Sequence, residues 1–303
     1  MLSVLIDGTN IKSLGLFLAE GSLDGWFKYP KRKAVSYNDW AEADGIEADL
    51  TEFSLQPRSF TLTFCHTGKG FMQAYNSLLT FLSKPGYRTL EIAGVSRSVR
   101  LDVGATVRIP IGFDSRVSTC GFTFIEDEPQ VEQAEPYCLK YIPSVFAVGS
   151  QDFMEFGIGS EDPGEDIIKS PRLKDPFTDG NMWDLNDVKS RHKETKLNLW
   201  MVADSPAEFV NNWRAFLAAW AVPGLVDLYI TGAGISVPAY YTDCTSFSVQ
   251  AYGDRGVGAT FSISVVIPQC SWLSMGGTTA ERGLYVVESD SFLTDEEGNV
   301  LIV

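Results

Sequence analysis

Residues 59–93 read SFTLTFCHTGKGFMQAYNSLLTFLSKPGYRTLEIA, and this stretch decides the fold because its pattern returns later in the chain. Residues 195–231 read TKLNLWMVADSPAEFVNNWRAFLAAWAVPGLVDLYIT. Both stretches contain an alternating strand, a polar turn, an amphipathic helix rich in aromatic residues, a Pro-Gly stop and a second strand. The sequence therefore predicts two related units in tandem.

The similarity extends outward from these two stretches in the same order along the chain. Glycines, prolines and aromatic residues recur at an offset that drifts only slightly, as small loop insertions would cause. The matched pairs are Gly8 with Gly149, Gly15 with Gly157, Lys28 with Lys169, Pro30 with Pro171, Asp44 with Asp179, Pro85 with Pro223, Phe122 with Phe261 and Pro129 with Pro268. We therefore predict an internal duplication with a first domain over 1–130, a second over 139–269, and a C-terminal extension over 270–303.

Composition indicates an ordinary globular protein. The 303 residues are 45% hydrophobic and 21% charged, which is enough apolar material for substantial cores. We expect no transmembrane helix, because no apolar run reaches 18 residues. The N-terminal segment has no basic region followed by a long apolar stretch, so we expect no signal peptide and synthesis in a cytoplasm.

The net charge of −15 argues against tight binding of nucleic acid. Phosphate binding needs clustered Lys and Arg, which are not evident in the sequence. Nucleic acid near such a surface would be repelled rather than held. The five cysteines form no CxxC pair and are odd in number, so buried reduced thiols are expected rather than disulfides or a zinc site.

Strands dominate the predicted secondary structure. The segments alternate in polarity or are rich in β-branched and aromatic residues, with abundant Gly and Pro between them. This pattern predicts a mainly β fold, a β-sandwich or small barrel with one packed α-helix per domain. The predicted strands are 4–7, 60–64, 88–94, 105–111 and 120–126 in the first copy, and 145–149, 196–202, 226–232, 246–252 and 259–267 in the second.

One amphipathic helix is predicted in each copy. The second begins with Ser205 as N-cap, Pro206 in the first turn and Glu208 completing a capping box. Core packing explains the apolar faces better than a partner-binding surface, which is the alternative. The first helix, about 69–83, would bury Phe71, Met72, Tyr75, Leu78, Leu79 and Leu82, and the second would bury Phe209, Val210, Trp213, Phe216, Leu217 and Trp220.

Two long polar segments interrupt the strands, at 19–58 and 159–195. Loops of this length are uncommon unless they are functional or ordered by a partner, although additional edge hairpins would also explain them. Residues 284–303 are predicted to form a β-hairpin, with the apolar end VLIV docked on a sheet or a neighbour.

Motifs that carry chemistry are nearly absent. Cys65 and His66 are neighbours in a predicted strand and should point to opposite faces, so a catalytic dyad is not expected. His192 lies in a charged run typical of a solvated surface. The oxygen ligands of 179–187 do not fit the calcium-loop pattern. We therefore predict no catalytic, cofactor-binding or metal-binding residue, and no enzymatic activity.

The tryptophans suggest an alternative class of function. Trp26, Trp40, Trp183 and Trp272 lie outside the predicted helices. Exposed aromatic rings on a β-sandwich can stack on sugars, although core and subunit contacts are the usual role. A duplicated β-sandwich carbohydrate-binding module is therefore the alternative to a structural protein.

The first copy resembles the N-terminal domain of phage distal tail proteins, which form an adaptor ring between tail tube and tip. The resemblance lies in the order of several individually weak segments. It implies a β-sandwich with a packed helix that assembles around a central channel. The segments are IDGTNIKSLGL (6–16), YPKRK (29–33), DWAEADG (39–45), LQPRSFTLTF (55–64), PGYRTLEI (85–92) and CGFTFIED (120–127).

The resemblance implies a virion component assembled in the bacterial cytoplasm, in a phage or a phage-like injection device, with tail-tube and tail-tip proteins as partners and DNA passing without specific binding. The chain departs from the family pattern in its duplication, and Thr195 stands near the place of Arg58 in the second copy. Heterologous interfaces repeat until a ring closes. A two-domain chain could therefore form a pseudo-sixfold ring from three chains, and a hexamer is the alternative.

Overall fold

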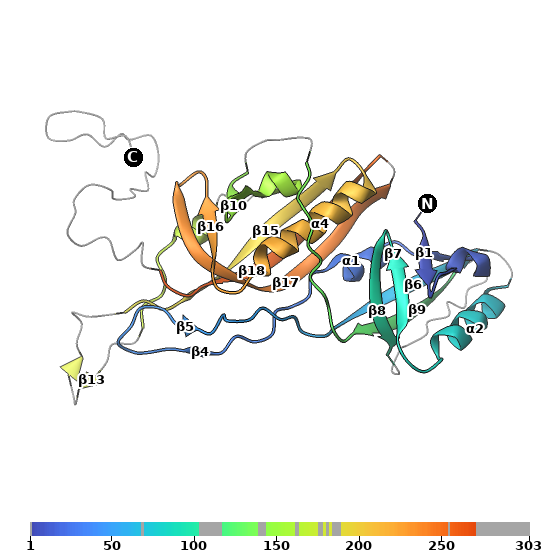
Figure 1. The fold of residues 1–303 in the computed structure, drawn as a ribbon, viewed down its shortest axis with the longest axis horizontal. Coiled ribbons are helices and arrows are strands. Elements are labelled where there is room, and N and C mark those ends of the chain that lie inside the picture. Colours follow the sequence, from blue (N-terminus) through green and yellow to red (C-terminus); the bar gives the residue numbers. More distant parts are fainter. Residues whose placement is uncertain are drawn as a thin grey trace.

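The structure is a computed structural model, and it describes residues 2–67, 70–102, 117–138, 144–160, 164–174, 178–179, 182–183, 189–253 and 255–270. Within these residues the fold is mainly β, as predicted. Two seven-stranded antiparallel sheets lie side by side along the longest axis of the molecule (Figure 1). The strand predicted at 105–111, the hairpin at 284–303 and Trp272 lie outside the described residues.

The first sheet is built from the N-terminal part of the chain. Its longest described pairing joins β6 and β9, in which Arg58 lies opposite Glu126 and Thr67 opposite Val117. In spatial order the strands are β2 (Thr9–Asn10), β1 (Val4–Ile6), β7 (Arg88–Ile92), β8 (Val95–Leu101), β9 (Val117–Glu126), β6 (Arg58–Thr67) and β3 (Leu16–Leu18).

The second sheet bends at a single long strand, β17. Its residues up to Ala239 pair with β16, and those from Tyr240 onward pair with β18. Three register shifts along β17 accommodate the bend, as β-bulges do. The spatial order is β11 (Gln151–Asp152), β10 (Phe146–Val148), β16 (Val226–Ile230), β17 (Ile235–Gly253), β18 (Gly256–Ile267), β15 (Lys193–Ala203) and β12 (Ile158–Ser160).

The two sheets have the same strand order, element by element. Each begins with a short hairpin and a 3-10 helix that ends at a left-handed glycine, Gly15 or Gly157. This agreement is what a duplication predicts; descent from a duplicated ancestor stays a prediction. The helices are η1 (Ile11–Leu14), α1 (Ser22–Phe27) and α2 (Phe71–Leu82) with the first sheet, and η2 (Phe153–Phe156), α3 (Glu165–Ile168) and α4 (Pro206–Trp220) with the second.

The main helices start and end close to their predicted positions. Ser205 caps α4 by accepting a hydrogen bond from the Glu208 backbone N–H at 3.2 Å. The predicted capping box is wrong in one detail, because the Glu208 carboxylate accepts from the Asp204 N–H, one residue before the cap. The face predicted for α2 includes Met72, which is instead 50% exposed, while Ala74 is buried in its place.

One apolar core runs through both sheets without interruption. It includes α1 residues of the first part of the chain, Trp26 and Phe27, together with Phe209 and Phe216 of α4. Residues 1–130 and 139–269 therefore share a core, and the domain boundaries stay a prediction.

Candidate functional site: the junction between the two sheets

The segment that joins α1 to β6 leaves the first sheet and runs along the second (Figure 1). We call residues 28–57 the first arm. It carries the small hairpin of β4 (Tyr37–Asn38) and β5 (Glu47–Ala48), and a bridge between Arg32 and Leu55 closes its base. The long predicted loop is thus a hairpin ordered by the other half of the same chain.

A buried ion cluster holds the point where the first arm begins. Glu126 on β9 lies between Arg58 on β6, at 2.6 Å, and Arg97 on β8, at 3.1 Å. Arg97 Nη2 donates to the Trp26 carbonyl at 3.1 Å, and Arg58 Nη1 donates to the Lys28 carbonyl. The cluster therefore satisfies carbonyls at the end of α1 that have no partner within the helix.

The ion cluster also contacts both halves of the molecule. The Arg97 guanidinium lies 4.6 Å from the Trp26 ring centroid and 5.4 Å from that of Trp213 on α4. Burial, followed by repulsion from Arg58, lowers the pKa of Arg97 to about 9, so the guanidinium remains charged at neutral pH. In the second sheet, the strand registers place Thr195 at the position of Arg58 and Val265 at the position of Glu126. They place Val237 at the position of Arg97.

Tyr29 anchors the first arm in the second half of the chain. It is 2% exposed and stacks on Trp213, with ring centroids 5.3 Å apart and planes 6° from parallel. Burial raises the pKa of the Tyr29 hydroxyl well above its usual range. The other rings around it belong to α4, β17 and β18, and they are Phe216, Phe247 and Phe261.

Hydrogen bonds across the junction fix the backbone of the arm next to this anchor. Tyr29 Oη donates to the Trp213 carbonyl at 3.1 Å, and Trp213 Nε1 donates to the Phe27 carbonyl at 2.7 Å. Tyr241 Oη donates to the Pro30 carbonyl at 2.8 Å. Each polar group that enters the core at these positions is therefore paired, which buried polar groups require.

Residues 39–45, which we call the tip of the first arm, are held at the far end of the second sheet. Lys174 Nζ donates to the carbonyls of Trp40, Ala43 and Gly45 at 2.6–2.8 Å, and pairs with the Asp39 carboxylate at 2.6 Å. A side chain from the second half thus gathers the polar end of the first arm. An ammonium group has three protons to donate, and the three carbonyls and the Asp39 carboxylate share them.

Gly45 brings the tip against the end of β18. Its N–H donates to the Ser190 carbonyl at 2.8 Å, and its φ is +69°. An added Cβ would lie 1.8 Å from the Pro268 carbonyl oxygen. The approach of these two backbones therefore requires glycine.

We expect Gly45→Ala to lower the free energy of unfolding by about 2–4 kcal/mol, since it combines left-handed strain with a backbone clash. Gly86→Ala is the matched control, because Gly86 also has a positive φ but no atom within 4 Å of an added Cβ. Urea denaturation compares the two. Equal losses in both variants would show that the contact with Pro268 contributes nothing.

The Asp44 carboxylate links the tip of the first arm to Ser190, which lies just before β15. Ser190 donates to it from its backbone N–H at 2.7 Å and from its hydroxyl at 2.9 Å. The backbone hydrogen bond is the main cause that lowers the pKa of Asp44. Stability from a carboxyl with a lowered pKa is present above its unfolded value and is lost as pH falls through the folded value.

We therefore expect Asp44→Ala to be less stable than the unmodified chain at pH 7, by about 1 kcal/mol because the site is partly exposed. The difference should shrink as pH falls below about 4, where the unfolded chain takes up this proton, and should be lost below the lowered pKa of the folded chain. Thermal unfolding of both proteins between pH 3 and pH 7 measures it. A difference that stays constant over that range would contradict the assignment.

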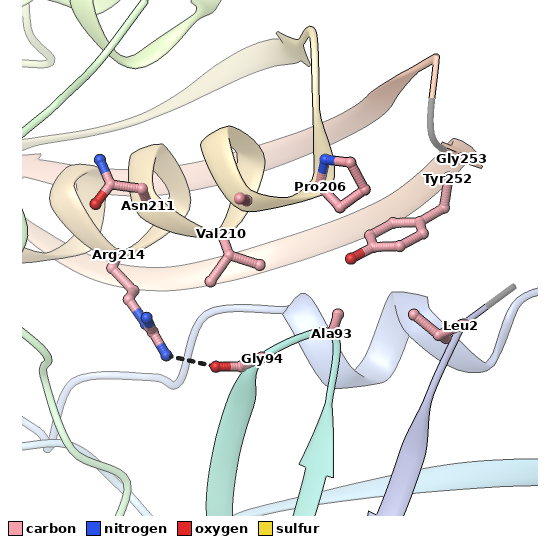
Figure 2. Close-up of a pocket in the computed structure, with 10 residues that line it drawn as sticks. Leu2, Ala93, Gly94, Pro206, Val210, Asn211, Arg214, Tyr252 and Gly253 are labelled. Atoms are coloured by element: carbon pink, nitrogen blue, oxygen red, sulfur yellow. Dashed lines mark hydrogen bonds between the residues drawn. The ribbon is translucent and has the colours of Figure 1, made fainter.

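A cleft of about 540 Å³ lies between the two halves on the side away from the arm tip. Figure 2 shows it between the N-terminal turns of α4, the β7–β8 turn and Tyr252 near the end of β17. Arg214 Nη2 donates across it to the Gly94 carbonyl at 3.1 Å, and Arg214 also pairs with Glu132 of the connecting segment at 2.8 Å. The cleft is thus bridged by contacts that join the halves.

The two histidines lie in different surroundings. Cys65 and His66 alternate along β6, with His66 buried beside Phe71 and Cys65 half-buried on the other face, as predicted. His192 is less solvated than predicted, because its ring lies 5.9 Å from that of Tyr37 on the first arm. None of the described cysteines forms a disulfide, and Cys120, Cys244 and Cys270 are buried. Burial raises the pKa of Cys120 to about 11 and of Cys244 to about 12.

The tryptophans divide between core and surface. Trp26 is fully buried under Arg97, whereas Trp40 is 55% exposed on the first arm and donates to Glu47 at 3.2 Å. The side chains of Trp183 and of the oxygen ligands at 179–187 lie outside the described residues. Among the described residues, no group of three or more His, Cys, Asp or Glu could hold a metal ion, and no helix could span a membrane.

Comparison with known proteins finds distant similarity among solved structures. No protein-family model matches the chain, and no curated protein matches it. Among solved structures, the chain is similar to the Dit protein of phage SPP1, described as a paradigm of the hub adsorption apparatus of phages that infect Gram-positive bacteria. The similarity covers 88% of this chain and 98% of that protein, at 10% identity and a TM-score of 0.31. Such values are too low to decide fold or function.

Proposed function

We propose that this protein is a structural, non-enzymatic component of a phage tail or a tail-like injection device, a ring-forming hub between tail tube and tail tip. The observation that supports it is the arm of the first unit docked on the second unit. One unit of the chain thus binds the next through a head-to-tail contact, and a contact of this kind generates rings when the rotation closes.

The shared strand order of the two sheets supports the stoichiometry that we propose. If each unit holds the next in the same way, three chains supply six units and close a pseudo-sixfold ring. A chain with a net charge of −15 suits a channel through which DNA passes, because like charges prevent DNA from adhering. Six chains with twelve units are the alternative.

Detection of the protein in purified tail particles tests the location. Mass spectrometry should find it at a few copies per particle, and gold-labelled antibody should mark only the tip-proximal end of the tail tube. Absence from intact particles, or labelling spread along the tube, would contradict a hub at that position.

A carbohydrate-binding module remains the second candidate, favoured by one observation. Trp40 and Tyr37 are each more than half exposed on the same arm. Glycan arrays with the full chain and with the Trp40→Ala and Trp183→Ala variants test it. Saturable binding that is lost on substitution would support the module, whereas the structural proposal expects no binding to any sugar.

A further inference from the structure

The helices α2 and α4 occupy the same place in the two halves of the chain. Each follows the long strand β6 or β15 and precedes the short strand β7 or β16. The helices align without a gap, from Phe71 with Phe209 to Leu82 with Trp220, and these four side chains are all buried. Each position on one helix therefore has a counterpart on the other.

The first half of the chain covers the face of α4 that points toward the junction. Val210 and Trp213 on this face are buried, and the Trp213 ring packs on that of Phe27. Arg214 Nη2 donates to the carbonyl of Gly94 in the turn between β7 and β8 (Figure 2). One half of the chain thus receives the other half on this helix.

The same face of α2 is open. Met72 stands at the place of Val210 and is 50% exposed, whereas Val210 is 5% exposed. Asn76 stands at the place of Arg214 and is also exposed. Exposed residues line a shallow hollow on this side of the helix, and we call them the outer face of α2: Met72, Gln73, Asn76, Ser77 and Thr80.

The outer face of α2 has the composition of an interface. Phe71–Leu82 contains no charged residue, in a chain of which 21% of the residues are charged. A helix face in water usually carries charged side chains. The centres of protein interfaces are instead depleted in charge and enriched in Met and aromatic residues, and Met72 and the half-buried Tyr75 are of these types. The face is therefore suited to an uncharged partner surface.

An uncharged surface of the required kind lies in the second half of the chain. The turn between β16 and β17, residues 231–234, reads TGAG and is mostly exposed. It is the counterpart of the β7–β8 turn, because each turn ends at a glycine with positive φ directly before the next strand, Gly94 or Gly234. The turn that meets α4 within the chain thus has an open equivalent.

These two surfaces do not meet within one molecule. Figure 1 shows α2 near one end of the longest axis, whereas β16 and β17 are joined on the other side of α4. A contact between the outer face of α2 and the β16–β17 turn therefore requires two copies of the chain.

We propose that the β16–β17 turn of one copy of this chain binds the outer face of α2 on the next copy, as the β7–β8 turn binds α4 within a chain. The inference rests on the ring assembly proposed above and names the surfaces that join its chains. Each chain offers one turn and one helix face, so the contact is head-to-tail. The Asn76 amide takes the role of Arg214 and donates to a backbone carbonyl of the turn.

A charge exchange tests the pairing on the full-length chain by sedimentation equilibrium in 150 mM NaCl. Asn76→Glu and Gly232→Lys should each weaken association about tenfold or more, because each buries an unpaired charge in an uncharged contact. The double variant should return to within about threefold of the unmodified chain, since every contact then joins a Glu to a Lys. Ser98→Glu, at an exposed position on β8, is the control for net charge and should associate as strongly as the unmodified chain.

Both substitutions are compatible with the fold. Glu has a higher helix propensity than Asn, so Asn76→Glu should not destabilise α2. Gly232 does not have a positive φ, and an added Cβ would meet no atom within 4 Å. Urea midpoints check that each variant folds, and Thr80→Glu on the same face replaces Asn76→Glu if the latter does not.

The behaviour of the unmodified chain separates the pairing from the ring. If the unmodified chain forms a ring and both single variants form it equally well, the ring stands and this pairing is wrong. A double variant that associates no better than the weaker single variant would also overturn the pairing. If the unmodified chain is monomeric at every concentration, both the pairing and the ring are contradicted.

Discussion

Tyr29→Ala should lower the free energy of unfolding by about 3–5 kcal/mol, the loss expected when a large aromatic side chain is removed from a core. The ring is 2% exposed and contacts aromatic residues of α4, β17 and β18, so its removal leaves a cavity at the junction. The first arm should also detach. Urea denaturation measures the first effect, and faster proteolysis within 28–57 measures the second.

Tyr29→Phe is the matched control, because it keeps the ring and removes only the hydroxyl that donates to the Trp213 carbonyl. The expected loss is about 1 kcal/mol. If Tyr29→Ala costs no more than Tyr29→Phe, the aromatic cluster does not anchor the arm. If proteolysis of the arm is unchanged in Tyr29→Ala, the anchor lies elsewhere along the segment.

Glu126→Gln should lower the free energy of unfolding by about 3–5 kcal/mol, because it leaves Arg58 and Arg97 buried together without a counter-ion. The two guanidiniums would then repel each other at the end of α1. Glu128→Gln, two residues along the chain and exposed, is the matched control and should change stability by less than about 0.5 kcal/mol. Equal effects in the two variants would contradict the role of the cluster.

The second sheet suggests how to replace the whole cluster. A triple variant, Arg58→Thr, Arg97→Val and Glu126→Val, installs the residues found at the corresponding positions there. Replacement of a buried ion cluster by apolar groups is often neutral or stabilising. We expect the triple variant to be more stable than Glu126→Gln. A triple variant less stable than Glu126→Gln would show that the arginine contacts to the Trp26 and Lys28 carbonyls dominate.

The sequence predicted the strands that alternate plainly, and it missed those that do not. β6, β9, β15 and β18 were predicted because apolar residues occupy every second position. β8 reads VSRSVRL, and one of its buried positions is occupied by Arg97. The apolar alternation that marks a strand is therefore interrupted. The first part of β17 contains Pro238, which usually argues against a strand, and its bulges break the alternation.

The junction itself could be predicted only in part. The length of 19–58 indicated either a functional or partner-ordered segment or an additional edge hairpin. Nothing in it showed that the segment is a hairpin ordered by the second half of the same chain. Tyr29 lies in a short basic segment, and burial among rings from distant strands is invisible in the local sequence. Ser205 and Pro206 placed α4 correctly because capping is a local interaction. Long-range contacts such as Lys174 with the carbonyl of Gly45 carry no such local signal.

The solution mass of the purified chain, measured by light scattering over a concentration series in low salt and checked by negative-stain images, tests the central claim most directly. The account predicts a closed ring of three 33.4 kDa chains, about 100 kDa, with six lobes around an opening. A two-fold symmetric dimer, a ring of six chains, or a monomer at every concentration would contradict it.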